Sequence, residues 1–185
     1  MITNLPLAHF SLENYHQMIE NGLLVNRRVE LIDGLILEMS PEGTEHTYFS
    51  ENLGKKLEKL LEKRAYVREN KPITLSNSEP EPDIAVVKLP RSQYFQHHPY
   101  PENILLLIEI SKSTLDYDTS IKKKIYAQEN IPEYWVVDVN RRKLISYRSP
   151  ALNTYKQNRE WLSGEKISPL AFPDISININ DIFCV

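Results

Sequence analysis

The stretches EPDIAVV at residues 81–87 and ILLLIEIS at residues 104–111 decide the fold of this chain. The second stretch opens with five apolar residues in a row, as expected of a central strand that is covered on both faces. It then carries Glu109, while the first stretch carries Asp83 directly before its own apolar run. Because a carboxylate at the end of a buried strand needs a partner, these two residues predict either a metal site or an ion pair.

The sequence around these stretches predicts further strands and helices. Apolar residues recur at helical spacing over 43–64, and helical character is also expected over 11–21 and 114–130. Asp33-Gly34 suits the tight turn of a hairpin. Extended segments are expected at 65–68, 73–75, 83–89, 104–111, 134–139 and 143–147, with a long connection over 90–103 and short extended pieces after residue 150. This order of elements predicts an α/β fold with a mixed central sheet flanked by helices.

Composition narrows the class of protein. The chain has 185 residues, 41% of them hydrophobic, which favours one domain over 1–185 with a substantial core. Its single cysteine, Cys184, has no partner within the chain, as is usual in a reducing cytosol. The five-residue apolar run is too short for a membrane helix, and the N-terminal stretch MITNLPLAHF lacks the features of a secretory signal. We therefore expect a cytoplasmic protein.

The net charge also restricts how the chain can bind nucleic acid. It has 22 Lys and Arg residues against 25 Asp and Glu residues, a net charge of −3. This balance argues against binding nucleic acid through the whole surface, so any phosphate-binding surface is expected to be local.

Three acidic residues, Glu30, Asp83 and Glu109, are candidates for one site. Carboxylates are ligands that Mg²⁺ and Mn²⁺ prefer, and such a metal ion can activate water and neutralise a phosphodiester. This chemistry also favours a lysine near the water. Ser111 shares a strand face with Glu109 but is not a lysine, so the better candidate is Lys122, which a packed helix can project over the strand end.

Each candidate also has a structural alternative. Asp83 could be only a turn residue, as expected for the second Pro-Asp pair at Asp174, and Lys122 could pair with Asp118 on a solvated helix face. Glu30 could form a cross-strand pair with Arg28 or a lysine. His46 falls on the apolar stripe of its helix, where a core histidine is the default interpretation. Tyr134 and Trp135 are expected in the core rather than as a stacking platform for bases.

Pro82-Asp83 followed by Glu109-Ile110-Ser111 resembles the signature of the PD-(D/E)XK nuclease superfamily, with serine at the lysine position. A wider set of blocks over about residues 28–148 resembles the Uma-two-like family of inferred restriction endonucleases. These blocks are VELIDGLILEMSP with a downstream His46, EPDIAVV, LLLIEISKST, DTSIKKKIYA and IPEYWVVDV.

This resemblance implies a restriction-endonuclease-like core and a site formed by Glu30, Asp83, Glu109 and Lys122. Asp83, Glu109 and the Ile110 carbonyl would bind Mg²⁺ or Mn²⁺. His46 and Ser111 would support the ligands or contact a phosphate.

The activity that we expect is metal-dependent endonuclease cleavage of DNA. Cutting both strands of a duplex favours a homodimer. The alternative is an inactive module on the same fold that binds nucleic acid or protein.

Overall fold

Six strands form one mixed sheet in the computed structural model, which describes residues 6–184. The start of the N-terminal stretch in which no secretory signal is expected lies outside these residues. The strands are β3 (Tyr66–Glu69), β4 (Ile84–Val87), β5 (Ile104–Ser111), β6 (Glu133–Asp138), β7 (Lys143–Ala151) and β8 (Thr154–Trp161), in that spatial order. Only β5 and β6 pair in parallel; the other neighbours are antiparallel. The expected mixed α/β sheet is confirmed.

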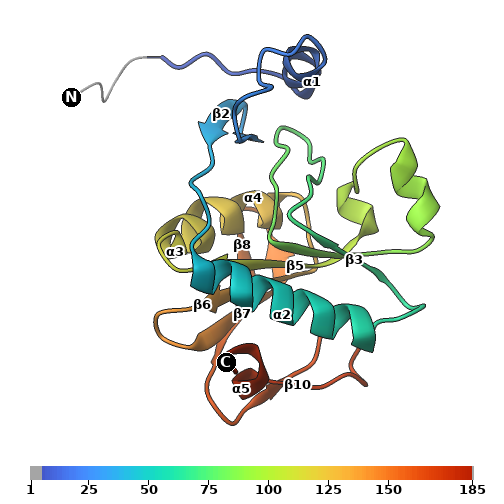
Figure 1. Cartoon of the computed structure of the whole chain (residues 1–185), viewed down its shortest axis with the longest axis vertical. Coiled ribbons are helices and arrows are strands. Elements are labelled where there is room, and N and C mark those ends of the chain that lie inside the picture. Colours follow the sequence, from blue (N-terminus) through green and yellow to red (C-terminus); the bar gives the residue numbers. More distant parts are fainter. Residues whose placement is uncertain (1–5, 185) are drawn as a thin grey trace.

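Helices cover both faces of this sheet (Figure 1). On one face, α2 (Thr44–Leu60) packs its apolar side against β4, β5 and β6. The C-terminal elements β9 (Lys166–Ile167), β10 (Ile177–Asn178) and α5 (Ile179–Ile182) close the same core. On the other face lies the segment with α3 (Leu115–Tyr117), η3 (Asp118–Lys122) and α4 (Lys123–Gln128). Trp135 and Tyr134 are fully buried, one in each core, as predicted.

The N-terminal elements stand above the edge of the sheet (Figure 1). They are α1 (Leu12–Glu20), which Ser11 caps, and the hairpin of β1 (Val29–Ile32) and β2 (Leu35–Glu38). The predicted hairpin turn is confirmed, because Asp33 and Gly34 both have positive φ, at 48° and 76°. An isolated β-bridge between Leu31 and Glu79 and a hydrogen bond from Gly34 to Asn77 join the hairpin to the segment before β4, which brings β1 over the carboxylate-bearing strand ends.

Several predicted elements differ from the structure. Residues 73–75 join no strand; Ile73 and Leu75 are buried in an irregular segment whose backbone bonds to Pro80 and Ser78. The single helix expected over 114–130 is interrupted by the π-helical turn η3. The connection over 90–103 holds two 3₁₀ turns, η1 (Arg91–Phe95) and η2 (Pro101–Asn103).

The region after residue 150 contains a full strand where only short pieces were predicted. In β8 most of the eight residues are exposed, since it is the edge strand, so its sequence lacks the apolar alternation that reveals half-buried strands. No helix among residues 6–184 is both long and apolar enough to cross a membrane.

Candidate active site

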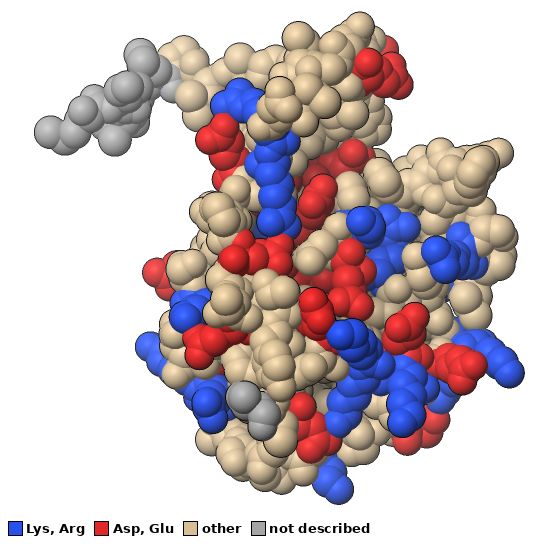
Figure 2. Space-filling view, viewed as in Figure 1, with Lys and Arg blue, Asp and Glu red and all other residues tan. Residues whose placement is uncertain are grey.

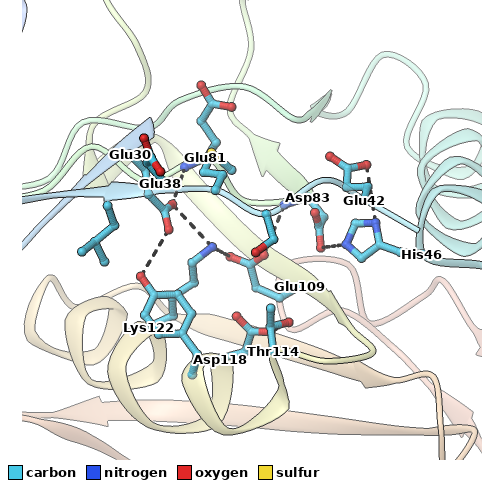
Figure 3. Close-up of a pocket in the computed structure, with 14 residues that line it drawn as sticks. Glu30, Glu38, Glu42, His46, Glu81, Asp83, Glu109, Thr114, Asp118 and Lys122 are labelled. Atoms are coloured by element: carbon cyan, nitrogen blue, oxygen red, sulfur yellow. Dashed lines mark hydrogen bonds and ion pairs between the residues drawn. The ribbon is translucent and has the colours of Figure 1, made fainter. Parts of the chain in front are cut away.

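An acidic pocket of about 380 Å³ opens where β4 begins and β5 ends, beneath the β1–β2 hairpin (Figure 3). Figure 2 shows acidic side chains gathered at the middle of this face of the molecule. The basic residues of its lining are Lys122, a cation, and His46, which can be protonated. The seven acidic lining residues are Glu30, Glu38, Glu42, Glu81, Asp83, Glu109 and Asp118. The pocket therefore carries a large excess of negative charge.

Asp83 and Glu109 lie side by side because β4 and β5 pair in antiparallel register, with Ile84 opposite Ile108. The Oδ2 atom of Asp83 accepts a hydrogen bond from the Ile110 amide at 2.6 Å and contacts His46 Nε2 at 3.1 Å. The Asp83 amide lies 3.4 Å from Glu109 Oε2. Both carboxylates are buried, Glu109 to 3% exposure. The strand ends thus present two fixed carboxylates to one pocket.

Lys122 reaches these carboxylates from the opposite side of the pocket. Its Nζ donates to Glu109 Oε1 at 3.0 Å and lies 3.6 Å from Glu30 Oε2. The hydroxyl of Tyr126, one helical turn later, donates to the same Glu109 oxygen at 2.9 Å. The predicted projection of Lys122 over the strand end is confirmed, and the alternative ion pair with Asp118 is not formed.

The widened turn η3 places Lys122 in this position. The Lys123 amide bonds back to the Asp118 carbonyl, five residues earlier, which identifies the turn as π-helical. Insertions of this type are frequent at functional sites because they rotate the residues that follow. At the start of the turn, Asp118 Oδ2 accepts hydrogen bonds of 2.6 Å from Ser111 and Thr114. The structure therefore places Ser111 beneath the pocket as a support for Asp118, not in its lining.

Glu30 extends the acidic wall from the hairpin. One of its oxygens accepts from the Glu81 amide at 3.3 Å, and the other accepts from the Tyr117 hydroxyl at 3.2 Å. Of the alternative partners, Arg28 instead binds Glu42, whereas a lysine, Lys122, does pair with Glu30 at 3.6 Å, although it lies on η3 and not on a facing strand. Among the described residues, Lys122 is the only cation that pairs with Glu30.

His46 lies in the pocket wall rather than in the core, so the default interpretation from its helix position is wrong. Its ring contacts Asp83 on one side and lies 3.5 Å from Glu42 Oε2 on the other. Burial lowers the pKa of His46, but the hydrogen bond to Asp83 and the nearby carboxylates outweigh this, so the pKa is raised. When it is protonated, the ring adds positive charge beside Asp83.

The charges of the pocket shift the pKa values of its other members. Burial raises the pKa of Glu109 well above its ordinary value, and the charges of Asp83 and Asp118 act in the same direction. Burial alone would lower the pKa of Lys122, but the charges of Glu109 and Glu30 prevail and raise it. Lys122 therefore stays protonated near neutral pH.

The donor set suits a small divalent cation. Ile110 bonds Asp83 through its amide, and the carbonyl of the next residue, Ser111, faces β6. Because backbone groups alternate along a strand, the Ile110 carbonyl faces the Asp83 side. In residues 6–184 no three His, Cys, Asp or Glu side chains converge as a ligand set. The available protein ligands are the carboxylates of Asp83 and Glu109 and the Ile110 carbonyl. Such a small set of oxygen ligands suits Mg²⁺, which usually keeps waters and substrate phosphate in its coordination shell.

Several lining residues were not predicted from the sequence. Glu38 and Glu42 come from the end of β2 and the loop that follows it, Glu81 from the segment before β4 and Tyr117 from α3, so only the folded chain brings them together. Tyr126 had a detectable signal, since it stands four residues after Lys122 and so shares its helix face.

Comparisons with known proteins relate the chain to a family and to solved structures. A family model named Uma2 and described as "Putative restriction endonuclease" matches residues 12–180. The chain is also similar to a solved structure from Anabaena variabilis, described as "a putative nuclease belonging to DUF820". The two are 15% identical with a TM-score of 0.67, over 84% of this chain and 89% of that one, which shows a shared fold. No curated relative matches the chain.

Proposed function

The chain belongs to the Uma2 family, and we propose that it is a Mg²⁺- or Mn²⁺-dependent endonuclease that hydrolyses DNA phosphodiesters in the acidic pocket. One observation carries the proposal: Asp83 and Glu109 meet at adjacent strand ends, with Lys122 Nζ 3.0 Å from Glu109. The family description and the nuclease-like fold of the solved neighbour support the same class of reaction.

In this proposal, Asp83, Glu109 and the Ile110 carbonyl hold the metal ion, and Glu30 completes the acidic wall. The bound ion would activate the attacking water and neutralise charge on the phosphate. Seven acidic residues line the pocket, so the bound cation would also offset negative charge that repels the phosphodiester, and we expect cleavage to require metal.

Lys122 would orient the attacking water rather than deprotonate it. A lysine can act as a general base only when it is neutral, and the flanking carboxylates raise the pKa of Lys122. As a buried cation it can hold Glu109 in place and donate a hydrogen bond to the water or to a phosphate oxygen. His46, through its contact with Asp83, would fix the orientation of that ligand.

Supercoiled-plasmid cleavage tests the proposal with wild type, Asp83→Ala and Lys122→Ala in Mg²⁺, Mn²⁺ or chelator. The matched control is Asp174→Ala, which removes the aspartate of the second Pro-Asp pair, where it binds Arg64 at the surface. We expect metal-dependent cleavage that is lost in Asp83→Ala, reduced at least a hundredfold in Lys122→Ala, as for the loss of one transition-state donor, and kept in Asp174→Ala.

Titration calorimetry with Mn²⁺ separates an inactive module from an enzyme given the wrong substrate. The nuclease model requires binding to the wild type and weaker binding to Asp83→Ala. Absence of both cleavage and metal binding would leave a nucleic-acid-binding or protein-interaction module as the better account.

We also propose that the enzyme acts as a homodimer in the cytoplasm, because two sites related by a twofold axis can cut both strands of a duplex. Light scattering that gives the mass of one 21.6 kDa chain at assay concentration would exclude this assembly.

A further inference from the structure

A second hollow, of about 470 Å³, lies at the β3 edge of the sheet, outside the acidic pocket. Tyr66 and Arg68 enter it from β3, where alternate residues share one face. The other side comes from η1. Six residues line this hollow, which we call the β3-edge hollow: Tyr66, Arg68, Arg91, Ser92, Tyr94 and Phe95.

Arg68 is a buried cation without a carboxylate partner among the described residues. It is 8% exposed, its Nη2 donates to the Pro72 carbonyl at 3.1 Å, and its Nε is buried with no hydrogen-bond partner. Arg148, by contrast, lies 2.6 Å from the buried Glu133 carboxylate. Because burying an unpaired charge is costly, the setting of Arg68 favours an anion that arrives from outside.

Aromatic rings and a second arginine surround this unpaired charge. The rings of Tyr66 and Tyr94 stack with centroids 6.2 Å apart, Arg91 lies 4.9 Å from the Tyr66 centroid and Arg68 lies 5.7 Å from that of Tyr94. Arg91 forms no ion pair within residues 6–184. Phe95, beside them, is 92% exposed. Guanidinium groups that bind phosphate next to an exposed ring are the elements of a single-strand binding site.

The register of the sheet relates this hollow to the acidic pocket. Arg68 is opposite Ala85, which is opposite Leu107. Asp83 and Glu109 lie two residues further along on the same face, so strand spacing places the Arg68 and Glu109 Cα atoms about 12 Å apart. Figure 2 shows basic side chains over β3 and the start of the segment after β4, next to the acidic centre of that face.

We propose that the β3-edge hollow binds one unpaired nucleotide of a single-stranded segment, with its phosphate on Arg68 and Arg91 and its base stacked on Phe95. This inference rests on the proposed function, since the segment would belong to the nucleic acid cleaved in the acidic pocket. A paired base cannot present its face to Phe95, so the hollow discriminates single strands and frayed or branched duplexes from intact duplex.

Fluorescence anisotropy with a labelled oligothymidylate in chelator tests binding without cleavage. Phe95→Ala and Arg91→Ala change exposed residues, so the fold is expected to remain intact. Arg159→Ala is the matched control, because Arg159 also covers a ring, Trp161 at 3.8 Å, but on β8 at the opposite edge of the sheet.

We expect Phe95→Ala to weaken binding about fivefold or more, as for the loss of one base–aromatic stack. Arg91→Ala should also weaken binding and lower the slope of log K against log salt by about 0.7, as for the loss of one phosphate contact. Arg159→Ala should bind like wild type, and intact duplex should compete less well than the single strand.

Binding by Phe95→Ala and Arg91→Ala that equals wild type, or no single-strand binding by wild type, overturns this inference. If inorganic phosphate and thymidine monophosphate compete equally well, the hollow binds only the phosphate and the proposed stacking of a base on Phe95 is refuted. Plasmid cleavage tests the acidic pocket separately. If the enzyme cleaves but Phe95→Ala leaves single-strand binding unchanged, only the proposed role of the β3-edge hollow is refuted. If binding depends on Phe95 but Asp83→Ala still cleaves, only the assignment of the acidic pocket is refuted.

Discussion

Replacement of Lys122 by methionine tests how the acidic pocket is held together. Methionine keeps most of the length of the lysine side chain but removes its charge, and with it the contact of Lys122 Nζ with the Tyr117 ring, 5.8 Å from the ring centroid. The change leaves Glu109 and Glu30 without the one lysine between them. We therefore expect Lys122→Met to fold but to lose substantial stability at alkaline pH.

The structure sets the size of that loss. The side chains of Lys122 and Glu109 are 7% and 4% exposed, and their charged atoms are 3.0 Å apart. With an effective dielectric constant of about 20, a pair at that separation attracts by about 5 kcal/mol. Removing one partner from a buried pair typically costs about 3–5 kcal/mol, because the other charge stays buried. A loss of about 3–5 kcal/mol follows for Lys122→Met at about pH 8.

The loss depends on pH with a definite sign. Burial raises the folded-state pKa of Glu109, and the lysine charge is the main influence that lowers it, so the variant raises this pKa further. A group whose folded pKa is raised stabilises the fold below its unfolded pKa, and that contribution is lost as pH rises through the folded value. Lys122→Met should thus regain stability between about pH 8 and pH 5.

Urea unfolding at both pH values measures this change, and Lys122→Met/Glu109→Gln supplies the double-mutant comparison. Since a neutral amide at position 109 needs no cation, the double variant should be more stable than Lys122→Met at about pH 8. A loss below about 1 kcal/mol, the range of exposed pairs, or one that does not vary with pH, would refute the idea of a buried ion pair.

Three further predictions concern His46 in the pocket wall and two residues outside the pocket. Because the folded pKa of His46 is raised, protonation of its ring stabilises the fold below about pH 6.5, and this stabilisation is lost at higher pH. His46→Asn should therefore lower the free energy of unfolding more at about pH 5.5 than at about pH 9, as measured by urea unfolding. Arg148→Met should destabilise by about 3–5 kcal/mol by leaving Glu133 as an unpaired buried charge, yet leave plasmid cleavage per folded molecule unchanged. Gly34→Ala should lower stability by about 1–2 kcal/mol, measured by thermal unfolding, because φ is +76° in the hairpin turn; an unchanged midpoint would contradict that interpretation.

Local signals predicted the elements that position the catalytic candidates. The apolar run ending in a carboxylate predicted β5 from residue 104 to 111, and Asp33-Gly34 predicted the hairpin turn. These predictions succeed because burial on both faces favours continuous apolar residues and positive φ favours Gly, Asn and Asp, so both features can be predicted from residue type. The exposed residues of edge strand β8 can be polar, so its sequence lacks an apolar pattern of this kind.

The acidic candidates could be predicted as a group, but their surroundings could not. Adjacent strand ends bring Asp83 and Glu109 together, so two strand assignments were sufficient for that pair. Glu42 and Tyr117 enter through the angles at which the hairpin and helices cross the sheet, which no local pattern specifies. The same reason explains His46, whose helix position is apolar but whose ring meets Asp83 only after α2 docks.

The serine at position 111 and the lysine at position 122 are physically connected. In the signature that this segment resembles, the lysine stands two residues after the acidic strand residue, and here that place is held by Ser111, which is fully buried. Its hydroxyl binds Asp118, the first residue of the π-helical turn, whose last residue is Lys122. The Tyr134 hydroxyl binds the Asp118 carbonyl and steadies the same turn.

A lysine at this fully buried position would remove the serine hydroxyl that donates to Asp118 and would push Asp118 away from Thr114. The turn that presents Lys122 would then lose its anchor, so the positions of Ser111 and Lys122 depend on each other. Ser111→Lys should therefore fail to restore cleavage to a Lys122→Ala protein. Restored cleavage in that double variant would show that the two positions are interchangeable and that the π-helical turn has no part in placing the cation.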